Sequence, residues 1–199
     1  MLKLLFPLPK QLTVALSGGV DSVAVADFLS RKHDVSCAFF HHGTENSERA
    51  FQFVSEFCGE RNLPLFLGYL HNSKPKEQST EEFWRNERYR FLESLDTPIV
   101  TAHNLDDCVE TYLYGSLHGQ PKVIPHQRNN ILRPFLTTPK YEFVSWCKRK
   151  GISWCEDTSN RDTKYMRNYI RHEIVPRAFQ VNPGLDTVVR KIVESKLPL

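Results

Sequence analysis

The first part of the chain alternates short apolar runs with amphipathic segments. Residues 12–16 are an apolar run that ends at a Ser-Gly-Gly turn, and residues 22–32 then carry apolar side chains at helical spacing. The same order recurs as an apolar run at 35–40, an amphipathic segment at 47–62 and a further run at 63–69. Strands that alternate with helices of these lengths predict an α/β fold, with a parallel sheet covered by helices on both faces. The ligand site of such a sheet lies at the carboxyl ends of its strands.

The alternation continues to about residue 115. The Ser-Thr-Glu-Glu sequence at 79–82 offers a capping box for a helix that runs to about residue 94. Residues 98–102 form a candidate buried strand, and Asn104 is placed to cap the helix that follows. These segments extend the predicted sheet by one strand and one helix.

The character of the chain changes after residue 121, where prolines become frequent. Thr138 as N-cap, Pro139 at the first helical position and Gly151 after the last predict a helix between them. A final pair of helices is predicted near 165–174 and 185–196, as a small helical appendage. We therefore expect an α/β domain at 1–137 and a helical extension at 138–199 that packs on the same domain.

Composition argues against several classes of protein but does not indicate a function. The formal net charge is only +3, so charge alone does not argue for a nucleic-acid partner, although basic residues gather between 140 and 177. The five cysteines are scattered and show no CxxC spacing, which predicts reduced thiols in the core rather than a zinc or iron–sulfur site. We see neither a signal peptide nor an apolar run of membrane-spanning length, so a cytoplasmic protein with no membrane partner is expected.

The strongest candidate site is the turn Ser17-Gly18-Gly19-Val20-Asp21-Ser22. Paired glycines between an apolar strand and a helix present backbone N–H groups at the positive end of the helix dipole, where phosphate oxygens bind well. Asp21 is an unexpected neighbour for phosphate unless a cation lies between them, so we assign Asp21 to Mg²⁺. The alternative is a plain strand-to-helix turn.

The turn matches neither the GxxxxGK[ST] nor the GxGxxG phosphate-binding pattern. It resembles the PP-loop of the ATP pyrophosphatases, which split ATP into AMP and pyrophosphate. That resemblance implies an α/β sandwich related to the adenine nucleotide α-hydrolases, with ATP and Mg²⁺ as cofactors. By the same resemblance, the ATP-contacting residues are Ala15, Ser17, Gly18, Gly19, Val20, Asp21, Ser22, Phe40, Ala102 and His103.

A second group of polar residues follows the strand predicted at 98–102. Within Thr101-Ala102-His103-Asn104-Leu105-Asp106-Asp107-Cys108-Val109-Glu110-Thr111, Asp107 and Glu110 stand one helical turn apart at the start of a helix. Acids at this position also stabilise a helix through its dipole, which is the simpler explanation. The preceding strand ends at the same sheet edge as the glycine-rich turn, however, and carboxylates there suit a metal ion or an incoming ammonium group.

This string is similar to the TAHHxDDQxET motif of the tRNA(Ile)-lysidine synthetase family, and other stretches agree with that family in order. They are 39–43, the helix with Glu82, Arg85, Arg88 and Tyr89, the Arg-Pro-Phe-Leu at 133–136, and residues 156–160 followed by 167–172. Departures from the family pattern occur at Phe39, His41, Asn104 and Cys108. Longer members carry C-terminal domains, and the chain corresponds to a short form without them.

The resemblance implies a ligase that modifies the wobble cytidine of an isoleucine tRNA with a CAU anticodon. ATP adenylates the C2 oxygen of cytosine, and free L-lysine then displaces AMP at C2, which yields lysidine, AMP and pyrophosphate. Asp107 and Glu110 are candidates for binding lysine or positioning its amine, Arg85 for contacting phosphate or the activated base, and Arg167 and Arg171 for holding the anticodon. The candidate catalytic residues are thus Asp21, Arg85, Asp107, Glu110, Arg167 and Arg171.

Other readings stay open from the sequence. The arginines also fit a solvated helix face, and the oligomeric state, including a homodimer, is undetermined. A tRNA sulfurtransferase of the 2-thiocytidine type shares the glycine-rich turn, but it would need a cysteine pair that the chain lacks. A non-catalytic relative that binds nucleotide or tRNA without turnover is the remaining alternative.

Overall fold

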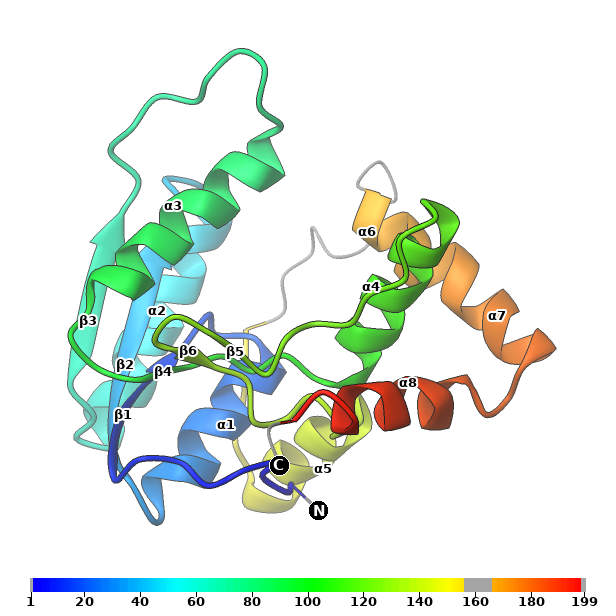
Figure 1. Ribbon diagram of the computed structural model, residues 1–199. Coiled ribbons are helices and arrows are strands. Elements are labelled where there is room, and N and C mark those ends of the chain that lie inside the picture. The colour runs from blue at the N-terminus through cyan, green and yellow to red at the C-terminus, as the bar shows by residue number, and fades with distance from the viewer. Residues whose placement is uncertain (1, 156–165, 198–199) are drawn as a thin grey trace.

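The computed structural model describes residues 2–155 and 166–197, and within them six strands form one sheet (Figure 1). In spatial order the strands are β3 (Leu65–Tyr69), β2 (Asp34–His41), β1 (Gln11–Ala15), β4 (Ile99–Val100), β6 (Ile131–Leu132) and β5 (Gln127–Arg128). All neighbouring strands are parallel except β5, which pairs antiparallel with β6. The predicted parallel sheet is confirmed. The β5–β6 hairpin was not predicted, because strands of two residues are too short to show a periodicity.

The order of the strands places a switch point between β1 and β4. From β1 the chain moves to β2 on one side, and after β3 it returns to pair β4 with the other side of β1. Loops that leave two neighbouring strands in opposite directions open a crevice at the carboxyl ends of those strands. The glycine-rich turn after β1 and the polar group after β4 therefore border the same crevice.

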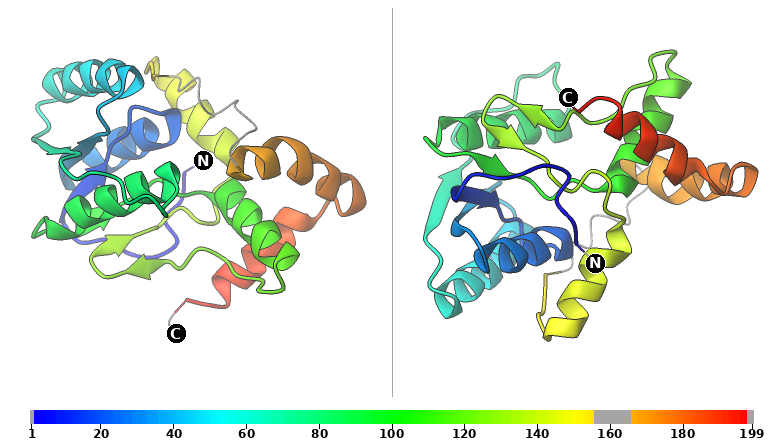
Figure 2. Two further views of the ribbon diagram at one scale, coloured as in Figure 1. Left: turned by 90° about the horizontal axis from the view of Figure 1, so that it is seen from above. Right: turned by 60° about the horizontal axis from the view of Figure 1, so that its bottom comes forward.

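Side chains of the central strands point alternately to the two faces of the sheet and pack in two separate apolar layers. Leu12 and Val14 of β1 belong to a core with helices α1 (Val20–Ser30), α2 (Glu45–Glu60) and α5 (Lys140–Lys150). Ile99 of β4 faces the other way and packs with α3 (Thr80–Ser94). The view from above shows α1 and α2 on one side of the sheet and α3 on the other, as the sequence predicted (Figure 2).

A third apolar cluster joins α4 to the C-terminal helices. Leu105 and Val109 of α4 (Leu105–Leu117) pack with Leu185 and Val189 of α8 (Leu185–Glu194), and α7 (Val175–Val181) adds partly buried side chains. Figure 1 shows these helices grouped beside the sheet. Since α5 packs on α1 through the buried Phe143 and Cys147, part of the segment after 137 belongs to the main core. The domain boundary at 137 stays a prediction.

The start of α5 corrects the predicted capping. Pro139 is the N-cap residue rather than the first helical residue, and the helix begins at Lys140. Thr138 is buried and donates its hydroxyl to the carbonyl of Lys3 at 3.3 Å instead of capping the helix. The free N–H of Lys140 is satisfied by Asp106 Oδ1 at 2.8 Å, so an acid from α4 replaces the expected local cap. Gly151 ends the helix in the left-handed region, as predicted.

Two other helix ends also differ in detail from the expectation. Ser79 accepts a hydrogen bond from the backbone N–H of Glu82, which is one half of the predicted capping box. The helix predicted to end at 174 continues, from α6 (Met166–Tyr169) through a π-helical segment η2 (Ile170–Ile174) into α7. Pro176 lies in the first turn of α7, where the missing N–H of proline is tolerated, and the wider π-helical turn precedes it, so the chain stays helical.

Candidate functional site

The glycine-rich turn is held in shape by its own serines. The backbone N–H of Ser17 donates to Ser22 Oγ at 3.1 Å, and Ser22 Oγ donates to the carbonyl of Gly19 at 2.9 Å. Gly18 has φ +85°, a conformation that side chains with a Cβ rarely adopt, which explains why glycine stands there. Gly19 is the N-cap of α1 and makes no side-chain cap, so the first N–H groups of α1 stay available for an anion.

Asp21 lies in the first turn of α1 and faces charges from two other helices. Its Oδ2 is 4.0 Å from the Nζ atom of Lys140, while its buried Oδ1 has no hydrogen-bond partner among the described residues. Burial raises the pKa of Asp21 to about 7, Lys140 opposes this, and Asp107 and Asp106 add to it. A buried carboxylate oxygen without a partner is suited to a cation.

Asp107 is fixed by the start of α4. Its Oδ2 accepts the backbone N–H of Asn104 at 3.0 Å, and Asn104 Oδ1 accepts the backbone N–H of Asp107 at 3.1 Å, which is a complete capping box. The predicted cap at Asn104 is confirmed. Burial and the neighbouring Glu110 raise the pKa of Asp107 to about 6, against the lowering effects of the Asn104 N–H and Arg171.

Glu110 and Asp107 already hold a cation. The guanidinium of Arg171 donates from Nε to Glu110 Oε1 at 2.6 Å and from Nη2 to Glu110 Oε2 at 3.0 Å, a bidentate pair. The same Nη2 is 3.5 Å from Asp107 Oδ1. We call Asp21, Asp106, Asp107 and Glu110, together with Lys140 and Arg171, the acidic centre.

The two arginines predicted to act together are separated. Arg171 joins the acidic centre, whereas Arg167 is exposed and its Nε lies 3.4 Å from Glu81 Oε1 at the start of α3. They lie four residues apart, and the helix changes to π-helical winding between them. Arg167 and Arg171 therefore contact different acids, and their assignment to the anticodon stays a prediction.

Arg85 belongs to a second, basic group on α3. Its guanidinium carbon is 4.9 Å from the ring centroid of the buried Tyr89, and those of Arg88 and Arg128 are 5.8 Å and 5.3 Å from the same centroid. Arg133 reaches the Tyr89 hydroxyl through Nη2 at 3.3 Å. We call these four arginines around Tyr89 the arginine cluster.

The remaining predicted nucleotide contacts lie at the carboxyl ends of three neighbouring strands. Ala15 ends β1, Phe40 stands near the end of β2, and Ala102 and His103 follow β4. Phe40 packs its ring against His42 and Phe91, with centroids 5.0 Å and 5.8 Å away.

His103 is held close to the arginine cluster. Its Nδ1 shares a hydrogen bond of 2.8 Å with the hydroxyl of Thr101. Burial, together with Arg133, Arg88 and Arg85, lowers its pKa well below the usual value, so His103 is neutral at pH 7.

Sequence reasoning missed three residues of this crevice. Lys140 and Asp106 join the acidic centre through a contact between the starts of α4 and α5. No local sequence pattern predicts that contact. Arg133 stands in the Arg-Pro-Phe-Leu stretch that drew attention to this segment, but its burial beside Tyr89 depends on the fold. The motif at 156–160 lies outside the described residues.

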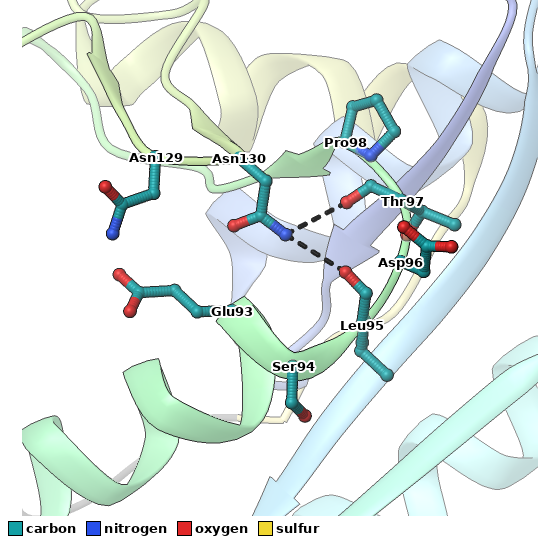
Figure 3. A pocket seen from close by; sticks show the side chains of 8 residues that line it. All are labelled: Glu93, Ser94, Leu95, Asp96, Thr97, Pro98, Asn129 and Asn130. Atoms are coloured by element: carbon teal, nitrogen blue, oxygen red, sulfur yellow. Dashed lines mark hydrogen bonds between the residues drawn. The ribbon is translucent and has the colours of Figure 1, made fainter.

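A pocket of about 570 Å³ lies away from this crevice, between residues 93–98 and Asn129 and Asn130. Figure 3 shows the Asn130 amide in this pocket, where it donates to the carbonyls of Leu95 and Thr97, each at 3.1 Å. These residues precede β4 and β6, so the pocket stands at the amino ends of the parallel strands. The opposite edge is the one that carries ligand sites in such sheets.

All five cysteines are free, and four of them are buried. Among residues 2–155 and 166–197, no three histidine, cysteine, aspartate or glutamate side chains gather as a metal cage. None of the helices in this part of the chain combines the length and the apolar character needed to cross a bilayer.

Sequence comparison relates the chain to curated enzymes. The tRNA(Ile)-lysidine synthase of Thermosipho africanus (strain TCF52B) is 32% identical over 203 residues, and that of Haemophilus ducreyi (strain 35000HP / ATCC 700724) is 29% identical over 199 residues. The matches cover 93% and 94% of this chain but 48% and 46% of those proteins. The chain thus spans about half the length of the curated relatives it matches.

Fold comparison finds solved structures of the same fold. An NH3-dependent NAD synthetase from Campylobacter jejuni superposes with a TM-score of 0.54 at 15% identity, covering 96% of this chain and 88% of that one. An NMN synthetase from Francisella tularensis gives 0.55 at 12% identity, with the same coverage. The family model described as PP-loop domain matches residues 3–178. Because that match includes both the glycine-rich turn and the polar group after β4, the chain belongs to the PP-loop domain family.

Proposed function

We propose that this chain uses ATP to activate the wobble cytidine of an isoleucine tRNA with a CAU anticodon and joins free L-lysine to it. The observation that carries the proposal is the acidic centre, where Asp107 and Glu110 hold the guanidinium of Arg171 beside the glycine-rich turn. A carboxylate pair that binds a cation on a long aliphatic stem has the chemistry to bind the ammonium end of lysine. The curated relatives named tRNA(Ile)-lysidine synthase support this substrate.

The first half of the proposed reaction transfers AMP to the C2 oxygen of cytosine, with release of pyrophosphate. The open N–H groups at the start of α1 would bind the phosphates, while the hydroxyls of Ser17 and Ser22, which bond to each other at 3.1 Å, would hold the turn in shape. The predicted contacts Ala15, Phe40, Ala102 and His103 would line the adenosine. Asp21 would hold Mg²⁺, which prefers one or two carboxylates together with phosphate oxygens and water and supplies charge stabilisation when bound.

In the second half, the amine of lysine attacks C2, the C2–O bond breaks and AMP leaves with its electron pair. The amine must lose a proton to become a nucleophile. Asp107, whose pKa is raised to about 6, would accept that proton, and Glu110 would hold the substrate. Lysine then competes with Arg171 for the same carboxylates. Arg85 is assigned to phosphate or the activated base, and Arg167, on the rim, to the tRNA.

The direct test is to incubate the protein with ATP, lysine and the isoleucine tRNA, and then to measure AMP release and the mass of the modified nucleoside. Lysine incorporation supports the proposal. If lysine is not incorporated but sulfur is when a sulfide donor is added, a sulfurtransferase replaces the proposal, and binding without any AMP release replaces it with a non-catalytic binding protein.

The role of the acidic pair is tested by Glu110→Gln. We expect the KM for lysine to rise at least about tenfold, since a charged hydrogen bond to the substrate is lost, while lysine-independent pyrophosphate exchange persists. Glu45→Gln, on the exposed start of α2, makes the same chemical change away from the site and serves as the control. An unchanged lysine KM in Glu110→Gln would exclude this pair as the lysine site.

A further inference from the structure

The arginine cluster concentrates positive charge around one buried side chain. Tyr89 is 4% exposed, and Arg85, Arg88 and Arg128 place their guanidinium carbons within 5.8 Å of its ring centroid. Arg133 adds a fourth guanidinium at the hydroxyl. These residues come from α3, from β5 and from the segment after β6, so the cluster is assembled by the tertiary fold.

Among the described residues, acids do not balance this charge. Arg128 lies 3.5 Å from Glu93, but no carboxylate lies within ion-pair distance of Arg85, Arg88 or Arg133 in the described part of the chain. Arg133 is 2% exposed, donates to the carbonyl of Pro125 at 2.9 Å, and its buried Nε has no partner. Burial and mutual repulsion lower the pKa of Arg85 and of Arg88. Bringing these cations together therefore costs folding free energy that no described carboxylate offsets at Arg85, Arg88 or Arg133.

The cluster is distinct from the acidic centre although both border the same edge of the sheet. The charges that act most strongly on Asp21 are those of Lys140, Asp107, Asp106 and Arg171, which all belong to the acidic centre. The charges that act on His103, at the end of β4, come from Arg133, Arg88, Arg85 and Arg167.

The two clusters consequently favour ligands of opposite charge. The planar guanidinium fork matches the oxygens of a phosphate ester in bidentate fashion. Arg128 and Arg167 are more than half exposed and are ion-paired with Glu93 and Glu81 at the margin of the cluster. The unbalanced positive charge is therefore that of Arg85, Arg88 and Arg133.

We propose that the arginine cluster is a second phosphate-ester site, separate from the glycine-rich turn, with Arg88 and Arg133 as its floor. The phosphate belongs either to the nucleotide or to the RNA backbone. The choice of these two ligands rests on the proposed function, whereas the site itself rests on the unbalanced guanidinium groups.

The test compares Arg88→Gln with wild type in the full chain. Calorimetry measures the binding of ATP and of adenosine, and filter binding measures the isoleucine tRNA at several salt concentrations. We expect adenosine binding to be unchanged and at least one of ATP and tRNA to bind about tenfold more weakly. Weaker ATP binding assigns the site to the nucleotide. Weaker tRNA binding, with a salt dependence reduced by about one phosphate contact, assigns it to the RNA.

Controls separate this role from a structural one. Arg49→Gln removes an exposed arginine of α2 and should leave the binding of both ATP and tRNA unchanged. Without ligand, Arg88→Gln should melt at the same temperature as wild type or higher, because it relieves repulsion. Unchanged binding of both phosphate ligands, an equal loss for adenosine, or a melting temperature lowered by several degrees would each overturn the proposal. Failure of lysine incorporation by a wild type whose ATP or RNA binding depends on Arg88 would refute the proposed function and leave this site standing.

Discussion

The acidic centre and the arginine cluster border the same crevice but are built in opposite ways. In the acidic centre each cation is paired with a carboxylate. Arg171 pairs with Glu110 and Asp107, and Lys140 lies beside Asp21. In the arginine cluster, guanidinium groups face one tyrosine and one another. The first group can exchange an internal cation for an external one, while the second gains its missing counter-charge only from an anion.

Under the two proposals, this difference separates two chemical tasks at one edge of the sheet. A lysine ammonium needs carboxylates that are partly neutralised and can accept a proton, and the raised pKa of Asp107 provides this. A phosphate needs fixed cations that remain charged at every physiological pH, which arginine provides. Three substitutions on the acidic side of the crevice test this contrast between the two groups.

Asp21→Asn is expected to have the largest effect. Replacing the carboxylate removes the charge that faces the turn and leaves the shape of the side chain, so AMP release should fall by roughly 100- to 1,000-fold. The measurement is single-turnover AMP formation with saturating ATP. If the rate stays within a factor of two of wild type, the acidic centre does not take part in activation.

Asp107→Asn should change how stability depends on pH. The pKa of Asp107 is raised from 3.8 to about 6 in the folded chain, so ionisation disfavours the folded state. The stability that the protonated group contributes is present below pH 4 and is lost as the pH rises through 6. Relative to the variant, wild type should therefore lose about 1–3 kcal/mol of unfolding free energy between pH 4 and pH 7. Urea unfolding at several pH values checks this, and parallel curves for the two proteins would contradict it.

Gly18→Ala should have the smallest effect on folding. The φ of +85° is unfavourable for alanine, although a Cβ would meet only ordinary contacts at 3.5 Å or more, so we expect a loss of about 1 kcal/mol. Gly59→Ala near the end of α2 is the matched control, since its Cβ would meet nothing within 4 Å and its φ is not positive. That change should leave stability equal or higher. Equal losses in both variants would show that the shape of the turn is not maintained by Gly18.

Local patterns predicted the helices and strands that carry their own signals. The glycine-rich turn, the cap at Asn104 and the left-handed Gly151 depend on neighbours only a few residues away, and the structure agrees with each. The β5–β6 hairpin and the continuation of the helix predicted near 165–174 past Pro176 into α7 were missed. Two-residue strands carry no period, and the π-helical turn that precedes the proline has no local signature.

The α/β class and the two candidate motifs could be predicted from the sequence alone, because hydrophobic periodicity and turn residues depend only on neighbouring positions in the chain. Which charged side chains come into contact depends on the tertiary structure. Lys140 joins Asp21 because the starts of α4 and α5 are in contact, and Arg171 rather than Arg167 reaches Glu110 because of how the last helices pack on α4. The energy of a charge depends on distance and burial, and both are set by residues far apart in the chain.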